Sequence, residues 1–152
     1  MTLSNKVWYF AYGSNLNVDQ MSTRVGEWHL SKRALARNYK LAFNVNSTRW
    51  QGHAANLQPS DRFDDVVYGV VYLLNEDQLK SLAKKEGVEA VTVAVELEDG
   101  NEIPHAKTFI WKTTGAGTAP SELYRRTMEE GLLEHGYKKA IVDKIFGNAV
   151  RR

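Results

Sequence analysis

One stretch near the start of the chain constrains the fold most: an apolar, aromatic segment that stops at a glycine. Residues 7–12 read Val-Trp-Tyr-Phe-Ala-Tyr, which favours a buried β-strand. Gly13 then breaks the strand, because glycine tolerates backbone angles and close approaches that other residues avoid. Ser14 and Asn15 are good helix N-caps, so a helical turn is predicted over residues 16–21. Such a junction leaves backbone N–H groups that suit a carboxylate or phosphate, although an ordinary strand-to-helix turn has the same pattern.

The composition fits a single globular domain spanning residues 1–152. Apolar residues make up 43% of the chain and charged residues 25%, and 20 basic side chains nearly balance 18 acidic ones. The sequence therefore predicts no nucleic-acid footprint and no membrane attachment, since no apolar run approaches the roughly 18 residues of a membrane span. The first residues lack the apolar core of a secretory signal, and the chain has no cysteine. A cytoplasmic location is expected.

Hydrophobic periodicity predicts an α+β order of elements. Alternating or continuous apolar patterns predict strands at residues 7–12, 33–46, within 47–60, and at 66–74, 91–97 and 103–111. Helical patterns lie within residues 17–31 and at 75–86, 121–135 and 137–147. An Asp-Gly-Asn turn at residues 99–101 predicts a hairpin. The resulting order is β-α-β-β-β-α-β-β-α-α.

The helix at residues 75–86 places one carboxylate on its apolar side. Asn75 and Gln78 have the spacing of a capping box, and Gly87 stands where a left-handed residue ends a helix. Glu86 lies seven residues after Leu79, on the face that the leucines bury. Burial and the negative helix end both favour a protonated carboxyl group, so Glu86 is expected to exchange a proton near neutral pH. Alternatively, Glu86 turns out past the helix end and pairs with a lysine.

Three motifs carry a resemblance to the γ-glutamylcyclotransferase family and its AIG2-like relatives. The Tyr-Gly-Ser-Asn-Leu motif stands at residues 12–16, Glu-Gly-Val at 86–88, and Pro-Ser-Glu-Leu-Tyr, which fits the family's Pro-Ser-x-x-Tyr, at 120–124. The resemblance extends over residues 7–147. It implies an α+β fold with a small, mostly antiparallel barrel-like sheet, peripheral helices and one pocket.

The resemblance also implies the site. Glu86 corresponds to the family's proton-transfer residue, and the hydroxyl of Tyr124 is expected in the substrate pocket, with a core tyrosine as the alternative. The other expected substrate-binding residues form one continuous stretch, namely Tyr9, Phe10, Ala11, Tyr12, Gly13, Ser14, Asn15 and Leu16. No metal and no organic cofactor are implied.

The activity implied is intramolecular aminolysis of a γ-glutamyl amino acid or amine, which yields 5-oxoproline and places the chain in glutathione metabolism. The expected partner is this small-molecule substrate, with the protein a monomer or homodimer. Two alternatives stay open: a cyclotransferase that removes the γ-glutamyl group from a γ-glutamylamine in a biosynthetic pathway, and a non-catalytic binder of small carboxylate metabolites. Many members of the family carry a tyrosine shortly after the Glu-Gly-Val element, and this chain has none there. Its leaving-group specificity can therefore differ.

Two further features are not assigned a part in the chemistry. His53 can titrate near neutral pH, but a role outside catalysis is favoured. Residues 112–120 contain Gly115 and Gly117, but the Lys-Ser/Thr pair that follows the glycines of a phosphate-binding loop is missing. The functional interpretation of this loop is therefore a flap over the site.

Overall fold

The computed structural model describes residues 5–113 and 117–150. Within these residues the chain forms seven strands, namely β1 (Lys6–Ala11), β2 (Ser31–Arg37), β3 (Tyr39–Ser47), β4 (Gly52–Pro59), β5 (Val66–Asn75), β6 (Val91–Leu97) and β7 (Glu102–Thr108). The helical elements there are η1 (Ser14–Leu16), α1 (Val18–Val25), α2 (Glu76–Glu86), α3 (Glu122–Glu134) and α4 (Lys139–Val150).

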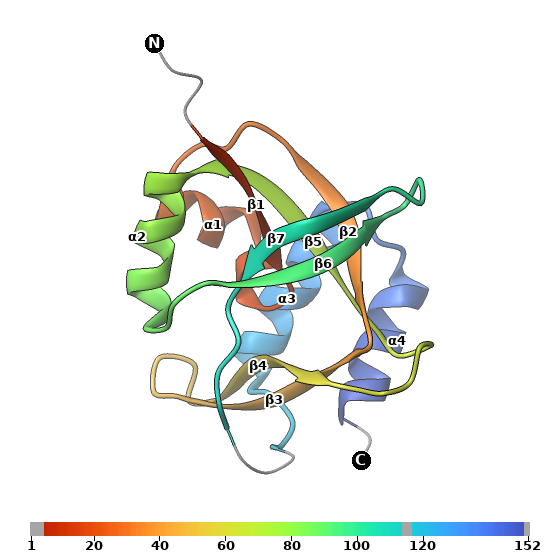
Figure 1. Cartoon of the computed structure of the whole chain (residues 1–152). Helices are drawn as coiled ribbons and strands as arrows, with labels where there is room; N and C mark the ends of the chain where they lie inside the picture. Colours follow the sequence, from red (N-terminus) through yellow and green to blue (C-terminus); the bar gives the residue numbers. More distant parts are fainter. Residues whose placement is uncertain (1–4, 114–116, 151–152) are drawn as a thin grey trace.

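Five strands close into a barrel in the order β1-β5-β2-β6-β7. Neighbours pair antiparallel except β1 and β7, whose parallel contact at Tyr9 and Lys107 closes the barrel. The Thr108 hydroxyl reinforces this closure by donating to the Phe10 carbonyl at 2.8 Å. The predicted α+β fold with a mostly antiparallel barrel is confirmed. Figure 1 shows the barrel strands crossing the centre of the molecule, with the β3–β4 sheet below them.

Strand β5 is central, as its continuous apolar run predicts. It pairs with β1 on one side and β2 on the other, and Val70, Val71 and Tyr72 are fully buried. Gly69 is required where β1 ends, because a Cβ there would lie 2.2 Å from the carbonyl oxygen of Ala11. This close crossing fixes the end of β1, and with it the turn that follows.

The strand predicted over residues 33–46 is wrong as a single element. Asn38 has a φ of 70°, in the left-handed region, and the chain turns there from β2 into β3. Strand β3 pairs antiparallel with β4 in a separate two-stranded sheet. The observed order therefore has one strand more than predicted.

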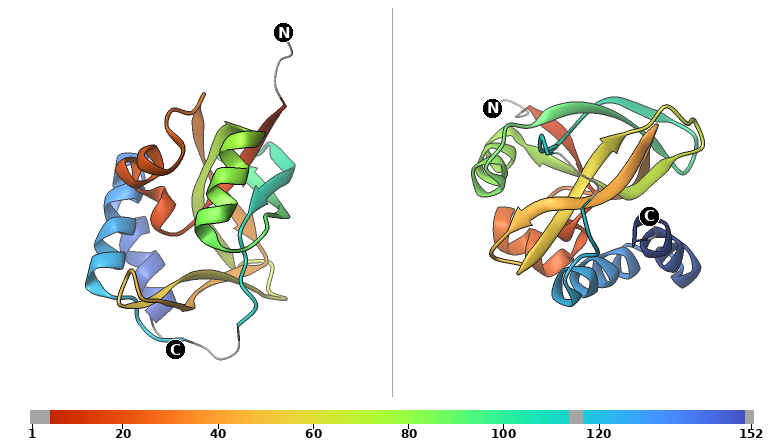
Figure 2. Two further views of the ribbon diagram at one scale, coloured as in Figure 1. Left: turned by 90° about the vertical axis from the view of Figure 1, so that its left-hand side faces the viewer. Right: turned by 90° about the horizontal axis from the view of Figure 1, so that it is seen from below.

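The helices cover the barrel on one side, as Figure 2 shows for α1, α3 and α4. Helix α2 begins with the predicted capping box between Asn75 and Gln78, and Gly87 ends it with a φ of 79°. In α4, Val142 and Phe146 are buried, whereas Ala140 is exposed. Helix α4 also continues past residue 147, where a stop was predicted.

The loop at residues 112–120 is only partly described. Gly115 lies outside the described residues, so the flap interpretation stays a prediction. The Thr118 N–H donates to the Phe43 carbonyl at 3.1 Å, which ties the described end of the loop to β3. None of the helices in the described part of the chain is both long and apolar enough to cross a membrane.

Candidate active site

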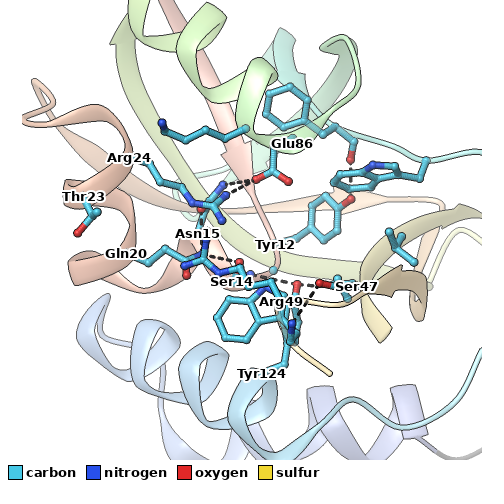
Figure 3. A pocket seen from close by; sticks show the side chains of 18 of the residues that line it. Tyr12, Ser14, Asn15, Gln20, Thr23, Arg24, Ser47, Arg49, Glu86 and Tyr124 are labelled. Carbon is cyan, nitrogen blue, oxygen red and sulfur yellow. Dashed lines mark hydrogen bonds and ion pairs between the residues drawn. The ribbon is translucent and has the colours of Figure 1, made fainter. Parts of the chain in front are cut away.

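A cavity of about 950 Å³ opens beside the end of β1. Figure 3 shows that η1, α1, the end of α2, the β3–β4 segment and the start of α3 contribute to its walls. Polar and aromatic side chains dominate the lining, which includes Tyr9, Tyr12, Ser14, Asn15, Gln20, Arg24, Arg49, Trp50, Glu86, Trp111 and Tyr124. A volume of this size is typical of small-molecule sites.

The turn after β1 is built differently from the predicted helix start. Residues Ser14–Leu16 form a 3₁₀ turn, and Asn17 rather than Ser14 or Asn15 caps α1, its side chain accepting from the Gln20 N–H. Gly13 is needed for a close approach, because a Cβ there would lie 2.5 Å from the Tyr124 hydroxyl oxygen. Among the described residues, no hydrogen bond engages the N–H groups of Gly13 or Asn15. The turn therefore keeps donors for a ligand.

Tyr124 comes from the first turn of α3, which Ser121 caps. Its hydroxyl oxygen accepts the N–H of Ser14 at 3.2 Å and the N–H of Ala55 at 3.0 Å. Both of these contacts are donated to the hydroxyl oxygen, so neither of them uses the hydroxyl proton. Burial raises the pKa of Tyr124 to about 12, so the hydroxyl is protonated at neutral pH.

Glu86 faces the cavity from the last turn of α2, as its helix position predicts. Its side chain is 17% exposed, and its Oε2 accepts from Arg24 Nη1 at 2.7 Å and from Asn15 Nδ2 at 3.0 Å. The alternative in which Glu86 pairs with a lysine outside the protein is therefore not the conformation found. Within the described part of the chain no hydrogen bond uses Oε1, so one carboxylate oxygen is held and the other is open to a ligand.

Asn15 links this carboxylate to the turn. Its Nδ2 also donates to the Tyr9 hydroxyl at 2.9 Å, and its Oδ1 accepts from Gln20 Nε2 at 3.2 Å. These contacts fix the orientation of the amide, because only the nitrogen can donate to Glu86. Tyr9 is fully buried beside the carboxylate, and burial, then the charge of Glu86, raise the pKa of its hydroxyl.

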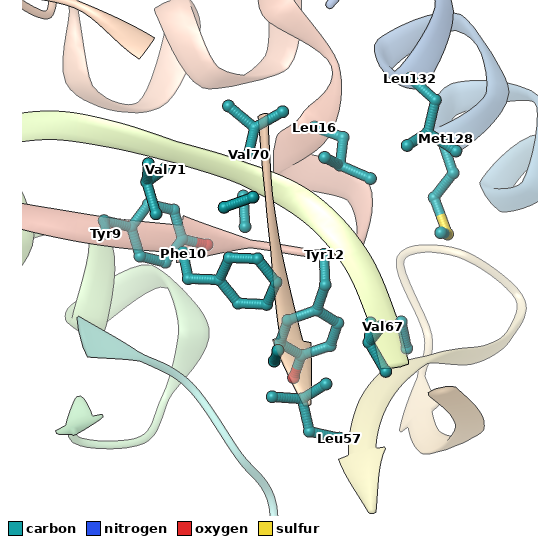
Figure 4. Packing of buried hydrophobic residues seen from close by; sticks show 14 of the residues in the cluster. Tyr9, Phe10, Tyr12, Leu16, Leu57, Val67, Val70, Val71, Met128 and Leu132 are labelled. Carbon is teal, nitrogen blue, oxygen red and sulfur yellow. The ribbon is translucent and has the colours of Figure 1, made fainter. Parts of the chain in front are cut away.

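The structure brings together most of the predicted site residues, namely Tyr9, Tyr12, Gly13, Ser14, Asn15, Glu86 and Tyr124. It does not bring Phe10, Ala11 or Leu16 to the cavity, since these side chains are buried in the core. Figure 4 shows Phe10 and Leu16 packed near Val70 and Met128. Alternation explains Phe10, because its side chain points to the opposite face of β1 from Tyr9. Leu16 lies in η1, outside the strand.

A comparison with known proteins decides which family the chain belongs to. The sequence profile described as "Gamma-glutamyl cyclotransferase, AIG2-like" matches residues 9–131, which is most of the chain. The chain belongs to the γ-glutamyl cyclotransferase, AIG2-like family. It is 31% identical to a γ-glutamylcyclotransferase of Bos taurus over 137 residues, covering 84% of this chain and 71% of that protein. It is 30% identical to the Homo sapiens γ-glutamylcyclotransferase over 146 residues, covering 90% and 76% of the two chains.

Solved structures agree with this family assignment. A structure named as a γ-glutamyl cyclotransferase superposes with a TM-score of 0.86 at 26% identity, over 97% of this chain and 90% of that one. An uncharacterized protein from Homo sapiens superposes with a TM-score of 0.85 at 27% identity, over 96% and 89%.

Several residues that line the cavity were not expected from the sequence. Arg24 and Gln20 come from α1, and Arg49 and Trp50 precede β4. Gln20 and Arg24 are four residues apart on a short helix and thus share a face, which is a signal that the sequence does contain. No local pattern connects Arg24 to Glu86, because the partners are 62 residues apart.

The remaining titratable candidates lie apart from this chemistry. His53 is outside the cavity lining, and its Nδ1 is 2.8 Å from the Thr118 hydroxyl. The described residues contain no cluster of three or more histidine, aspartate or glutamate side chains that could hold a metal ion.

Proposed function

We propose that the chain is a γ-glutamylcyclotransferase that converts a γ-glutamyl amino acid or amine to 5-oxoproline and the free amino acid or amine. One observation carries this proposal: the Glu86 carboxylate faces the Gly13–Asn15 turn within one cavity, joined to it by the 3.0 Å contact from Asn15 Nδ2. The family membership and the γ-glutamylcyclotransferase relatives support the same reaction.

Glu86 acts first as the base. Its Oε1 removes a proton from the α-ammonium group of the substrate, while Arg24 and Asn15 hold Oε2. The freed amine nitrogen then attacks the γ-carbonyl carbon of the same molecule and closes a five-membered ring.

The turn and Tyr124 stabilise the charge that develops. The N–H groups of Gly13 and Asn15 and the Tyr124 hydroxyl are donors available at the cavity, and they suit the α-carboxylate or the negative γ-oxygen. Preorganised donors of this kind are typically worth about 10²–10³ in rate each.

The reaction ends with a proton transfer in the opposite direction. The bond between the γ-carbon and the leaving nitrogen breaks as the oxyanion collapses, and protonated Glu86 returns its proton to that nitrogen. The ring nitrogen also loses its second proton, which ends on the released amine. The base is thus regenerated, and the products are 5-oxoproline and an ammonium group on the leaving molecule. Much of the acceleration comes from holding the folded-back substrate so that amine and carbonyl meet.

A product assay tests the proposal. We expect 5-oxoproline, detected by mass spectrometry, when the protein is incubated with a panel of γ-glutamyl dipeptides and γ-glutamylamines. Saturable binding of these compounds without any formation of 5-oxoproline would contradict catalysis and would favour a carboxylate-binding protein. Absence of both binding and turnover would reject the cavity as a γ-glutamyl site.

A further inference from the structure

Arg49 is a cation on the cavity wall that the reaction described above does not use. In Figure 3, Arg49 and Ser47 lie across the view from Arg24 and Gln20. The Arg49 guanidinium lies over the Trp50 ring, 5.2 Å from its centroid. Cation–π stacking of this geometry restrains an arginine while leaving its N–H groups free to face outward.

This arginine is connected to the site through aromatic packing. The buried Trp50 ring meets the Tyr124 ring edge-on, with centroids 5.0 Å apart and an interplanar angle of 89°. The Tyr124 hydroxyl oxygen in turn accepts hydrogen bonds from the N–H groups of Ser14 and Ala55. Arg49 is exposed in the turn between β3 and β4, and its guanidinium packs on a ring that borders Tyr124.

The charges of the lining are unequal. The cavity lining has an excess of one positive charge, because it contains three cations, Arg24, Arg49 and Lys85, and two anions, Asp19 and Glu86. Arg24 is engaged by Glu86 at 2.7 Å, whereas no ion pair within the described residues involves Arg49. A γ-glutamyl amino acid carries two carboxylates and one ammonium, a net charge of −1. A simple γ-glutamylamine has no net charge.

We propose that Arg49 binds the carboxylate of the leaving amino acid and thereby selects γ-glutamyl amino acids over γ-glutamylamines. The inference rests on the proposed cyclotransferase function. The substrate ammonium and the leaving nitrogen must both lie within reach of Glu86, so the remainder of the leaving group extends from there along the rest of the cavity. A guanidinium matches a carboxylate through paired N–H donors, which makes arginine well suited to this contact. Arg49 is a specificity-determining residue and takes no part in proton transfer.

Two substrates that differ by a single carboxylate test this assignment. γ-Glutamyl-L-alanine and γ-glutamylethylamine share one skeleton, and only the first has a carboxylate on the leaving group. We expect the unmodified protein to prefer γ-glutamyl-L-alanine in kcat/KM by about tenfold or more, as for one charge-assisted hydrogen-bonded contact. Arg49→Gln should lose this preference by lowering kcat/KM for the dipeptide alone, and Arg49→Lys should restore part of it.

Two other variants serve as comparisons. Arg62→Gln removes an equal charge from an exposed loop outside the cavity and should leave both kcat/KM values unchanged. Lys85→Gln removes the other unassigned cation of the lining and should leave the preference intact. The proposal is overturned if Arg49→Gln lowers kcat/KM equally for both substrates, if Lys85→Gln abolishes the preference, or if the unmodified protein prefers γ-glutamylethylamine.

Failure of the underlying reaction can be told apart from failure of this inference. If no substrate yields 5-oxoproline, calorimetric titration of the same two compounds into the protein and Arg49→Gln still measures the carboxylate contact. Tighter binding of γ-glutamyl-L-alanine that Arg49→Gln weakens about tenfold would support the role of Arg49. Equal binding of the two compounds would reject it.

Discussion

At the scale of single residues, Tyr124 combines a structural and a chemical role in one hydroxyl group. Tyr124→Phe leaves the buried N–H groups of Ser14 and Ala55 without their acceptor. We expect the free energy of unfolding to fall by about 1–3 kcal/mol and kcat/KM to fall roughly a hundredfold. Tyr39→Phe removes a hydroxyl outside the cavity and is the matched control. Equal effects of the two variants, measured by urea denaturation and steady-state kinetics, would contradict the role given to Tyr124.

Arg24 provides a second prediction at this scale. Its side chain is 10% exposed in its ion pair with Glu86, so Arg24→Gln should cost roughly 2 kcal/mol, somewhat below fully buried pairs. Arg126→Gln breaks a pair whose side chains are 62% and 83% exposed, and should cost less than about 1 kcal/mol. Urea denaturation of both variants measures the difference. Similar small losses would mean that the Arg24–Glu86 contact contributes little to holding the carboxylate.

At the scale of elements, α2 carries Glu86 and depends on the cap at its other end. Asn75 Oδ1 accepts the Gln78 N–H at 2.8 Å, and Gln78 Oε1 accepts the Asn75 N–H at 2.9 Å. Asn75→Ala removes the side-chain acceptor and should lower the free energy of unfolding by about 1 kcal/mol. Asn75→Asp keeps an acceptor and should lose much less. A loss in Asn75→Asp as large as in Asn75→Ala would argue against the capping box.

The same elements show what a local sequence can specify. The start and end of α2 were predictable, because caps depend on residues three or four positions apart. The break between β2 and β3 was not, since the alternation of apolar residues gives no sign of the left-handed Asn38. The cap of α1 was misplaced for a related reason: Ser14, Asn15 and Asn17 are all good N-caps, and tertiary contacts at the cavity decide among them.

At the scale of the whole molecule, His135 connects the helical layer to the site. Its Nε2 is 3.0 Å from the Tyr72 hydroxyl, which donates to the Asn15 carbonyl at 2.9 Å. Burial lowers the pKa of His135 from 6.5, so the folded protein binds this proton less readily than the unfolded chain. Stability contributed by the neutral ring is full above about pH 6.5 and declines as the pH falls through the folded-state pKa.

This linkage predicts a pH dependence of stability. The urea midpoint of the unmodified protein should be lower at pH 5.5 than at pH 7.5, and His135→Gln should show a smaller difference because it lacks the titrating ring. His105→Gln, at an exposed strand position, serves as the control and should keep the full difference. An unchanged difference in His135→Gln would show that His135 does not couple protonation to folding.

The site as a whole was predictable only in part. The resemblance of three motifs gave Glu86, Tyr124 and the turn, because these residues recur together in the family. It also included Phe10 and Leu16, since a motif does not say which side chains of a strand face the cavity. Arg24 was not found because it meets Glu86 across 62 residues of sequence, and Arg49 was not found because it lines the cavity only in the folded chain.

The most direct measurement is the turnover of Glu86→Gln. The substitution keeps the size and a hydrogen-bonding oxygen of the side chain but removes the basic carboxylate. With γ-glutamyl-L-alanine or γ-glutamylethylamine, whichever the unmodified protein turns over faster, we expect kcat to fall by about 10²–10⁴ while the variant stays folded and still binds that compound. Formation of 5-oxoproline at a rate close to that of the unmodified protein would contradict proton transfer by Glu86.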